Sequence, residues 1–271
     1  MLSTTSCEKQ VAMNTEGVQS VKVSDFNRSG EIHNAFLTNA KDNFEIVESI
    51  TDKDEKVEVV YQLNKSFVTS LDISSTEKKL LIADLNKTKN LVQEDVLVAK
   101  CFGGLLSNES SKNKKTIFEM IQDLKTSGVI NDESYQILNS LSNDLKANYE
   151  DALSDDQLKK NVLALINDFD NIGYAKNSEG EMAGTILAIS IASIEWWEEN
   201  PDALLSGDSK SRMLAPWVAG DLVGAVWGGA TGAIASYAGA GKVNWGSVGI
   251  GALSGAISGS TGAIGRISSW F

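Results

Sequence analysis

The residues that could carry out catalysis are few and lie far apart in the sequence. His33 is the single histidine, so a Ser-His-Asp triad would have to use it as the general base. No G-x-S-x-G element is present to carry a nucleophilic serine, and no H-E-x-x-H sequence is present to bind zinc. We therefore interpret His33 as a histidine that caps or packs a helix.

Two glycine-containing stretches come close to nucleotide-binding motifs without matching them. Ser236–Val243 has the spacing of a phosphate loop, but it begins with serine instead of glycine and ends with valine instead of serine or threonine. Gly249–Ser254 has serine where a dinucleotide fingerprint needs its third glycine. The acidic runs lack the ligand spacing of a calcium-binding loop. We expect a protein that is not an enzyme and that uses no cofactor or metal.

The charge is distributed unevenly along the 271 residues. The net charge is −12, and Met213–Phe271 contributes +1 from Asp221, Lys242 and Arg266, so the first 212 residues carry −13. An acidic body argues against nucleic acid as a partner, because phosphate binding needs clustered lysine and arginine. The last 56 residues hold 14 of the 23 glycines and four of the six tryptophans, which indicates a boundary between residues 204 and 215.

Apolar residues at helical spacing, with only two prolines, predict an all-α fold. Capping boxes at Ser74–Glu77 and Ser154–Gln157 predict two helix starts. Met182–Ile194 has no charge and is too short to cross a bilayer, which suits a core helix. The tryptophan pair Trp196–Trp197 is then either the packed end of that helix, which we favour, or an aromatic contact patch. We expect residues 29–203 to form an acidic body of several helices.

The N-terminal residues 1–28 are expected to be a flexible tether, because residues 8–28 are polar and lack periodicity. A leucine, small residues and then Cys7 resemble the end of a bacterial lipoprotein signal, which predicts lipidation of Cys7 and a place in the cell envelope, in the outer membrane or periplasm. The alternative is a cytoplasmic protein in which this cysteine is incidental.

Residues 216–271 contain small residues at every fourth position, which predicts an antiparallel glycine-zipper helical hairpin. Small residues at this spacing let two helix backbones approach closely. The predicted zipper residues are Gly220, Gly224, Gly228, Gly232, Ser236, Gly251, Gly255 and Gly259.

One register of this hairpin satisfies several pairings together. It places Gly228 level with Gly259 and Gly232 level with Gly255. The same register brings Asp221 to Arg266, which predicts an ion pair between them.

The outer face of the hairpin could be covered by lipid or by the body. Each predicted helix is about 31 Å long, close to the ~30 Å hydrocarbon thickness of a bilayer. Trp217 and Trp270 at one end, with Tyr237 and Trp245 at the other, resemble membrane-interface aromatics. Glycine, alanine and serine add little hydrophobicity, however, and the alternative is a hairpin packed on the body.

The tail sequence GDLVGAVWGGATGAI resembles the glycine-zipper segments of bacteriocin-like peptides. The whole layout resembles uncharacterised Bacteroidota lipoprotein-like proteins. Those have a G-x-x-H-N helix, represented by Gly30, His33 and Asn34, and a W-x-x-x-D-x-x-G-A tail, which begins here at Trp217. The resemblance implies no known activity.

Our first hypothesis is therefore a non-enzymatic cell-envelope protein whose hairpin associates with membrane or with itself. The second is a soluble all-α binding or scaffold protein, in which the Met182–Ile194 helix contacts the hairpin.

Overall fold

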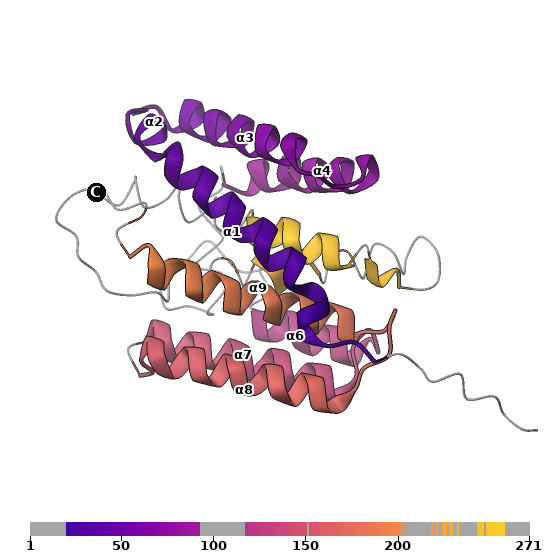
Figure 1. Ribbon diagram of the computed structural model, residues 1–271. Helices are drawn as coiled ribbons and strands as arrows, with labels where there is room; N and C mark the ends of the chain where they lie inside the picture. Colours follow the sequence, from indigo (N-terminus) through magenta and orange to yellow (C-terminus); the bar gives the residue numbers. More distant parts are fainter. Residues whose placement is uncertain are drawn as a thin grey trace, which may run out of the picture.

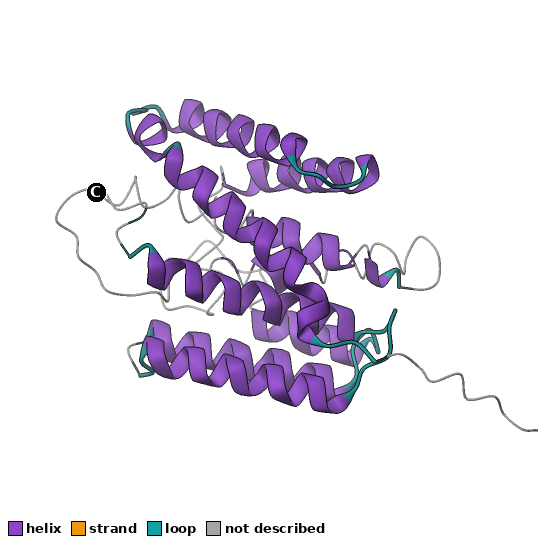
Figure 2. Ribbon diagram, viewed as in Figure 1, coloured by secondary structure: helices purple, strands orange, loops and turns teal. Residues whose placement is uncertain are grey.

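The computed structural model describes residues 20–92, 117–150, 152–201 and 203, and part of the C-terminal region. In that region, which we call the C-terminal segment, the described residues are 218, 221, 224–226, 228–229, 232, 243–246 and 248–257. Of the interpretable residues 80% are helical, and none of them forms a strand (Figure 2). The predicted all-α class is thereby confirmed, while the complete hairpin extends beyond the described residues.

The helices form two groups that meet along α1 (Figure 1). The pair α3 and α4 lies on one side of α1, and α9 lies on the other side with α6, α7 and α8 beyond it. The elements are η1 (Val23–Phe26), α1 (Asn27–Asp42), α2 (Phe44–Glu48), α3 (Lys53–Ser70), α4 (Ser75–Val92), α6 (Ile117–Thr126), α7 (Asp132–Tyr149), α8 (Asp155–Ile172) and α9 (Gly180–Glu199).

Local capping interactions explain where several helices begin. The Ser74 backbone N–H donates to Glu77 at 2.7 Å, and the Glu77 N–H donates to the Ser74 hydroxyl at 3.2 Å, so this capping box is confirmed. Hydrogen bonds from Ser74 also lower the pKa of Glu77. At the start of α8 the Gln157 N–H donates to the Ser154 hydroxyl, as the sequence predicts for that half of the second box.

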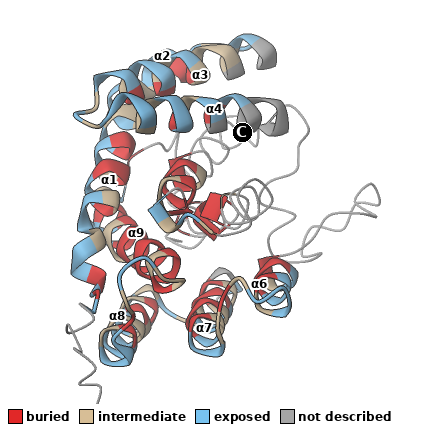
Figure 3. Ribbon diagram, turned by 90° about the vertical axis from the view of Figure 1, so that its right-hand side faces the viewer, coloured by how far each residue is buried: buried red, intermediate tan, exposed pale blue. Residues whose placement is uncertain are grey.

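Helix α9 forms the centre of the body. It contacts η1, α1, α7 and α8, and most of its residues between Gly180 and Trp197 are buried (Figure 3). A helix that is apolar all round is stable only when neighbours cover every face. Trp196 and Trp197 are 6% and 3% exposed, which favours the packed helix end over a contact patch.

Part of the expected tether, from residue 20 onward, contacts the helical body. Val21 and Val23 are buried, and their backbone N–H groups donate to the Tyr174 carbonyl at 2.8 Å and to Asp170 Oδ1 at 2.9 Å. The stretch has no helical periodicity, but its two valines lie at alternate positions and contact the end of α8 and the loop that follows it. Residues 1–19, including Cys7, lie outside the described residues.

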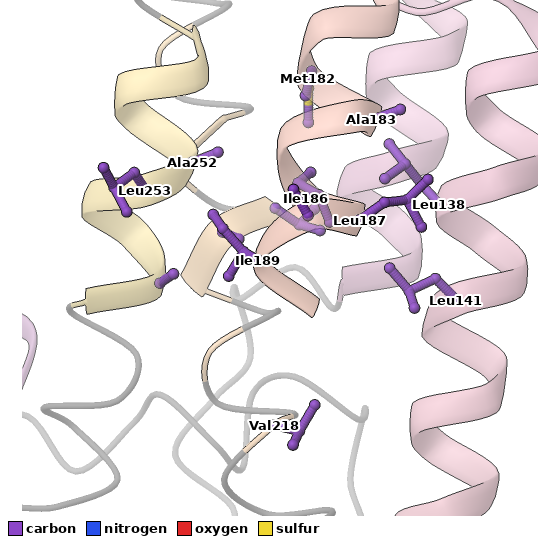
Figure 4. Packing of buried hydrophobic residues seen from close by; sticks show 14 of the residues in the cluster. Leu138, Leu141, Met182, Ala183, Ile186, Leu187, Ile189, Val218, Ala252 and Leu253 are labelled. Atoms are coloured by element: carbon purple, nitrogen blue, oxygen red, sulfur yellow. The ribbon is translucent and has the colours of Figure 1, made fainter. Parts of the chain in front are cut away.

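Truncation of Leu187 should test the central role of α9. Leu187 is fully buried on the side of α9 that faces Leu138 and Leu141 of α7 (Figure 4). Leu187→Ala should lower the free energy of unfolding by about 2–5 kcal/mol, because it removes apolar contacts and leaves a cavity. Urea unfolding followed by far-UV circular dichroism measures this loss.

The matched control is Leu163→Ala on α8, where the leucine is 44% exposed. It should cost less than about 1 kcal/mol. Equal losses for the two variants would contradict the placement of α9 at the centre of the core.

Candidate functional site

A buried polar contact joins the C-terminal segment to two helices of the body. The Ser193 hydroxyl of α9 donates to Asp221 Oδ2 at 2.6 Å, and His33 Nε2 of α1 lies 3.3 Å from the same oxygen. All three residues are 0% exposed. We call this group the Asp221 node. A carboxylate removed from water needs such partners, because a buried charge without compensation is strongly destabilising.

Helix α1 brings His33 to the node through a close approach to α9. A Cβ atom at Gly30 would lie 2.8 Å from the Ala192 Cβ and 2.9 Å from the Ala188 carbonyl oxygen, so glycine permits this spacing. One turn further on, the Asn34 side-chain amide donates to the Ala192 carbonyl at 3.0 Å. The three residues of the G-x-x-H-N motif therefore all lie at the contact between α1 and the α9 region.

The environment of His33 provides oxygen atoms for both ring nitrogens. Nε2 faces Asp221, and Nδ1 lies 3.4 Å from Asn34 Oδ1. The Asn34 amide nitrogen is held by the α9 backbone, which orients its oxygen toward the ring. Each ring nitrogen that carries a proton thus has an acceptor within reach. The prediction of a packing histidine is confirmed. The contact of His33 with the carboxylate of Asp221 was not predicted from the sequence.

The C-terminal segment contains direct contacts between glycine backbones. A Cβ atom at Gly228 would collide with the Gly251 carbonyl and would lie 3.0 Å from the Gly255 Cα. A Cβ atom at Gly255 would collide with the Gly224 carbonyl. From Gly224 to Gly228 the contacted residue moves back from Gly255 to Gly251, so the two helical pieces run in opposite directions. Gly232 is described as half-buried and helical.

The register of these contacts differs from the predicted one. Gly255 lies against Gly224 and Gly228, whereas the sequence-based register placed it level with Gly232. The physical reason is that glycines recur every fourth residue. A shift by four or eight residues therefore again brings small residues opposite small residues, and the spacing alone cannot select among these registers.

The segment also packs directly on α9. A Cβ atom at Gly229 would lie 3.2 Å from the terminal methyl of Met182, and one at Gly249 would lie 3.4 Å from Thr185 Oγ1. Figure 4 shows the helical piece that carries Ala252 and Leu253 beside the side of α9 that carries Met182. Body and segment residues belong to one hydrophobic cluster. The contact that the second hypothesis required is therefore present.

The order of groups in the Asp221 node differs from that of a hydrolytic triad. In a triad the imidazole lies between the serine and the carboxylate, so that it can accept the serine proton. Here the carboxylate lies between Ser193 and His33, and Ser193 donates its hydrogen bond to Asp221. The arrangement therefore suits a structural contact and not the activation of Ser193 as a nucleophile.

Several predicted site residues cannot be placed. Trp245 is partly buried against the hydrophobic cluster, so one of the four predicted interface aromatics contacts the protein core. Since Arg266 is not described, its predicted ion pair with Asp221 stays a prediction. The predicted site residues outside the described part of the chain are Cys7, Trp217, Gly220, Ser236, Tyr237, Gly259, Arg266 and Trp270.

The sequence contained a signal for the node that the residue spacing alone did not reveal. Asp221 is the single acidic residue of Met213–Phe271, and Ser193 lies in an uncharged run. His33 lies on the helix face that buries Ile32 and Phe36. Polar side chains in apolar surroundings nearly always find polar partners when they are buried. This argument could have suggested that the three residues meet.

The described residues contain neither a candidate membrane span nor a candidate metal site. None of the helices in that part of the chain is long and apolar enough to be a candidate membrane span. Within the same residues, no group of three or more His, Cys, Asp or Glu side chains is arranged to hold a metal ion.

Comparison of the chain with protein-family models, with curated proteins and with solved structures finds no match. The resemblance to Bacteroidota lipoprotein-like proteins therefore stays a prediction.

Removal of the carboxylate should test the node energetically. Asp221→Ala should lower the free energy of unfolding by about 3–5 kcal/mol, because Ser193 and His33 lose a buried partner. Ser193→Ala should cost about 1–3 kcal/mol, and the double variant should lose less than the sum of the two single variants. Urea unfolding of the four proteins gives the coupling.

A suitable control is Asp132→Ala, since Asp132 contacts Lys125 at 2.8 Å but has a side chain that is 72% exposed. Its loss should cost at most about 1 kcal/mol. If Asp221→Ala is as mild as Asp132→Ala, or if the double variant is strictly additive, the node does not act as one buried network.

Proposed function

We propose that this protein is a non-enzymatic helical scaffold whose body binds its own C-terminal segment and covers the apolar surface of that segment. The observation that carries the proposal is the hydrogen bond from Ser193 to the fully buried Asp221. A carboxylate is stable at such a depth only if the groups that surround it stay in place. In this proposal the C-terminal segment is the ligand that the helical body binds.

The composition of the contact supports the same proposal. The described residues of the segment place small and apolar side chains in the shared cluster, each at most 6% exposed: Val218, Ala225, Val226, Val248, Ala252, Leu253, Ala256 and Ile257. Exposure of such a surface to water would be unfavourable in proportion to its apolar area. The body would act by keeping that surface covered.

A second candidate function is association of the segment with membrane or with itself. It is favoured by the backbone contacts of Gly228 with Gly251 and Gly255, since helix pairs within membranes use small residues in this way. Lipidation of Cys7 and a place in the cell envelope belong to this candidate. Vesicle flotation of the intact protein, of Gly228→Leu/Gly255→Leu and of Gly229→Leu, in which the segment should leave α9, tests it, and binding by none of the three proteins would remove it.

Displacement of the segment from α9 tests the scaffold proposal directly. Gly229→Leu should push the segment off α9, because the Cβ atom alone would lie 3.2 Å from the Met182 methyl and the rest of the leucine side chain needs further space. Hydrogen exchange read by mass spectrometry should then rise in peptides from both α9 and the segment. In the unsubstituted protein both regions should be protected, and the protein should be monodisperse without detergent.

Gly246→Leu is the matched control for this substitution. Gly246 is exposed, and among the described residues a Cβ atom there would meet only the Asn244 side chain, at 3.5 Å. Its exchange pattern should equal that of the unsubstituted protein. Fast exchange of the segment in the unsubstituted protein, at the rate of a free peptide, would show that the body does not hold it.

A further inference from the structure

The Asp221 node is a buried polar contact, and such contacts respond differently to apolar replacement and to loss of one partner. Replacement of a buried ionic network by apolar residues of similar volume is often neutral or stabilising, whereas loss of one partner is strongly destabilising. The described part of the segment carries one charged residue, Asp221, and that residue lies in the contact with the body. One polar group therefore has a large influence on whether the segment stays bound.

The contacts within the segment are separate from its contacts with the body. Gly228, Gly251 and Gly255 meet through backbone atoms of the segment itself, whereas Gly229 and Gly249 face Met182 and Thr185 of α9. Departure from α9 would therefore leave the glycine contacts in place. What would be lost is the cover over the apolar residues and the partners of Asp221.

The surface uncovered in this way fits a lipid bilayer better than it fits another copy of the chain. It is apolar and, apart from Asp221, uncharged among the described residues, and Trp245 lies at the start of the second helical piece. Aromatic residues next to apolar helices favour the membrane interface. A second copy would offer the same α9 face only if its own segment had also left.

We propose that the Asp221 node is an autoinhibitory latch: while it is closed the C-terminal segment is held on α9, and when it opens the segment binds a lipid bilayer. The inference rests on the proposed binding of the segment by the body. It adds to that function a second, membrane-bound state that the node controls. Substitution of a node residue removes a contact that holds the segment, and it therefore serves to open the latch in an experiment.

Vesicle flotation of the full chain tests the latch, with phosphatidylcholine vesicles as the probe. All variants carry Cys7→Ser and Cys101→Ser, so that neither lipidation nor native thiols affect the result. Asp221→Ala should raise the vesicle-bound fraction over that of the parent protein by about tenfold, which corresponds to ~1.4 kcal/mol. Ser193→Ala, which removes one donor and keeps the carboxylate, should raise it less.

A reversible crosslink separates release of the segment from damage to the fold. Thr185→Cys with Gly249→Cys should form a disulfide, because a Cβ atom at Gly249 would lie 3.4 Å from Thr185 Oγ1, the atom that the new sulfur at position 185 replaces, so that small side-chain shifts can bring the two sulfurs into bonding distance. When the cysteine pair is added to Asp221→Ala and oxidised, the vesicle-bound fraction should fall to the parent level. Reduction of the disulfide should raise that fraction again to the level of Asp221→Ala. Asp170→Ala, which removes the acceptor of the Val23 N–H elsewhere, should leave flotation at the parent level.

The outcomes distinguish this inference from the function on which it rests. If the cysteine pair fails to crosslink in the parent protein, the segment is not bound on α9 and the scaffold proposal fails. If the pair crosslinks but Asp221→Ala and Ser193→Ala stay unbound to vesicles, the latch is wrong and the scaffold proposal stands. Assembly of Asp221→Ala into dimers, without vesicle binding, would likewise overturn the latch in favour of exchange of the segment between copies.

Discussion

The structure depends on how one carboxylate is kept out of water. Asp221 lies in a segment that otherwise brings apolar and small residues to the core, and it is completely buried. Its described partners, Ser193 and His33, come from α9 and α1, so this one group specifies the relative positions of three parts of the chain. Apolar packing alone is tolerant of small shifts, whereas a hydrogen bond of 2.6 Å to a buried oxygen is not.

The central position of α9 follows from the need to keep its apolar surface out of water. Its residues are apolar on every side, so α1, α7, α8 and the C-terminal segment each cover one part of it. The close approach of α1 requires glycine at position 30, and the approach of Phe26 requires glycine at position 184. These small residues reduce helix propensity, and the loss is offset by the backbone proximity that they permit.

Two kinds of contact meet in the C-terminal segment, and they differ in what they specify. The glycine contacts between its helical pieces are short-range and repeat every four residues, so they stabilise helix–helix packing without specifying a unique register. The contacts with the body are few and individual: Asp221 with Ser193 and His33, and the packing on Met182 and Thr185. The body therefore selects one arrangement from the set that the segment alone would permit. The scaffold and membrane hypotheses concern the same apolar surface of the segment, which is covered by α9 in the first and by lipid in the second.

The sequence by itself determined the helical class, the capped starts of α4 and α8 and the buried character of α9, because caps and periodicity act over a few residues. Only the tertiary structure decided the register of the glycine contacts, the ordered place of Val21 and Val23, and the partners of Asp221. In the sequence, Arg266 was the evident partner for Asp221, since opposite charge is visible at any separation. The apolar surroundings of Ser193 and His33 indicate that these side chains need polar partners. Only the folded structure showed that both contact Asp221, because a buried hydrogen bond depends on distances that no local pattern encodes.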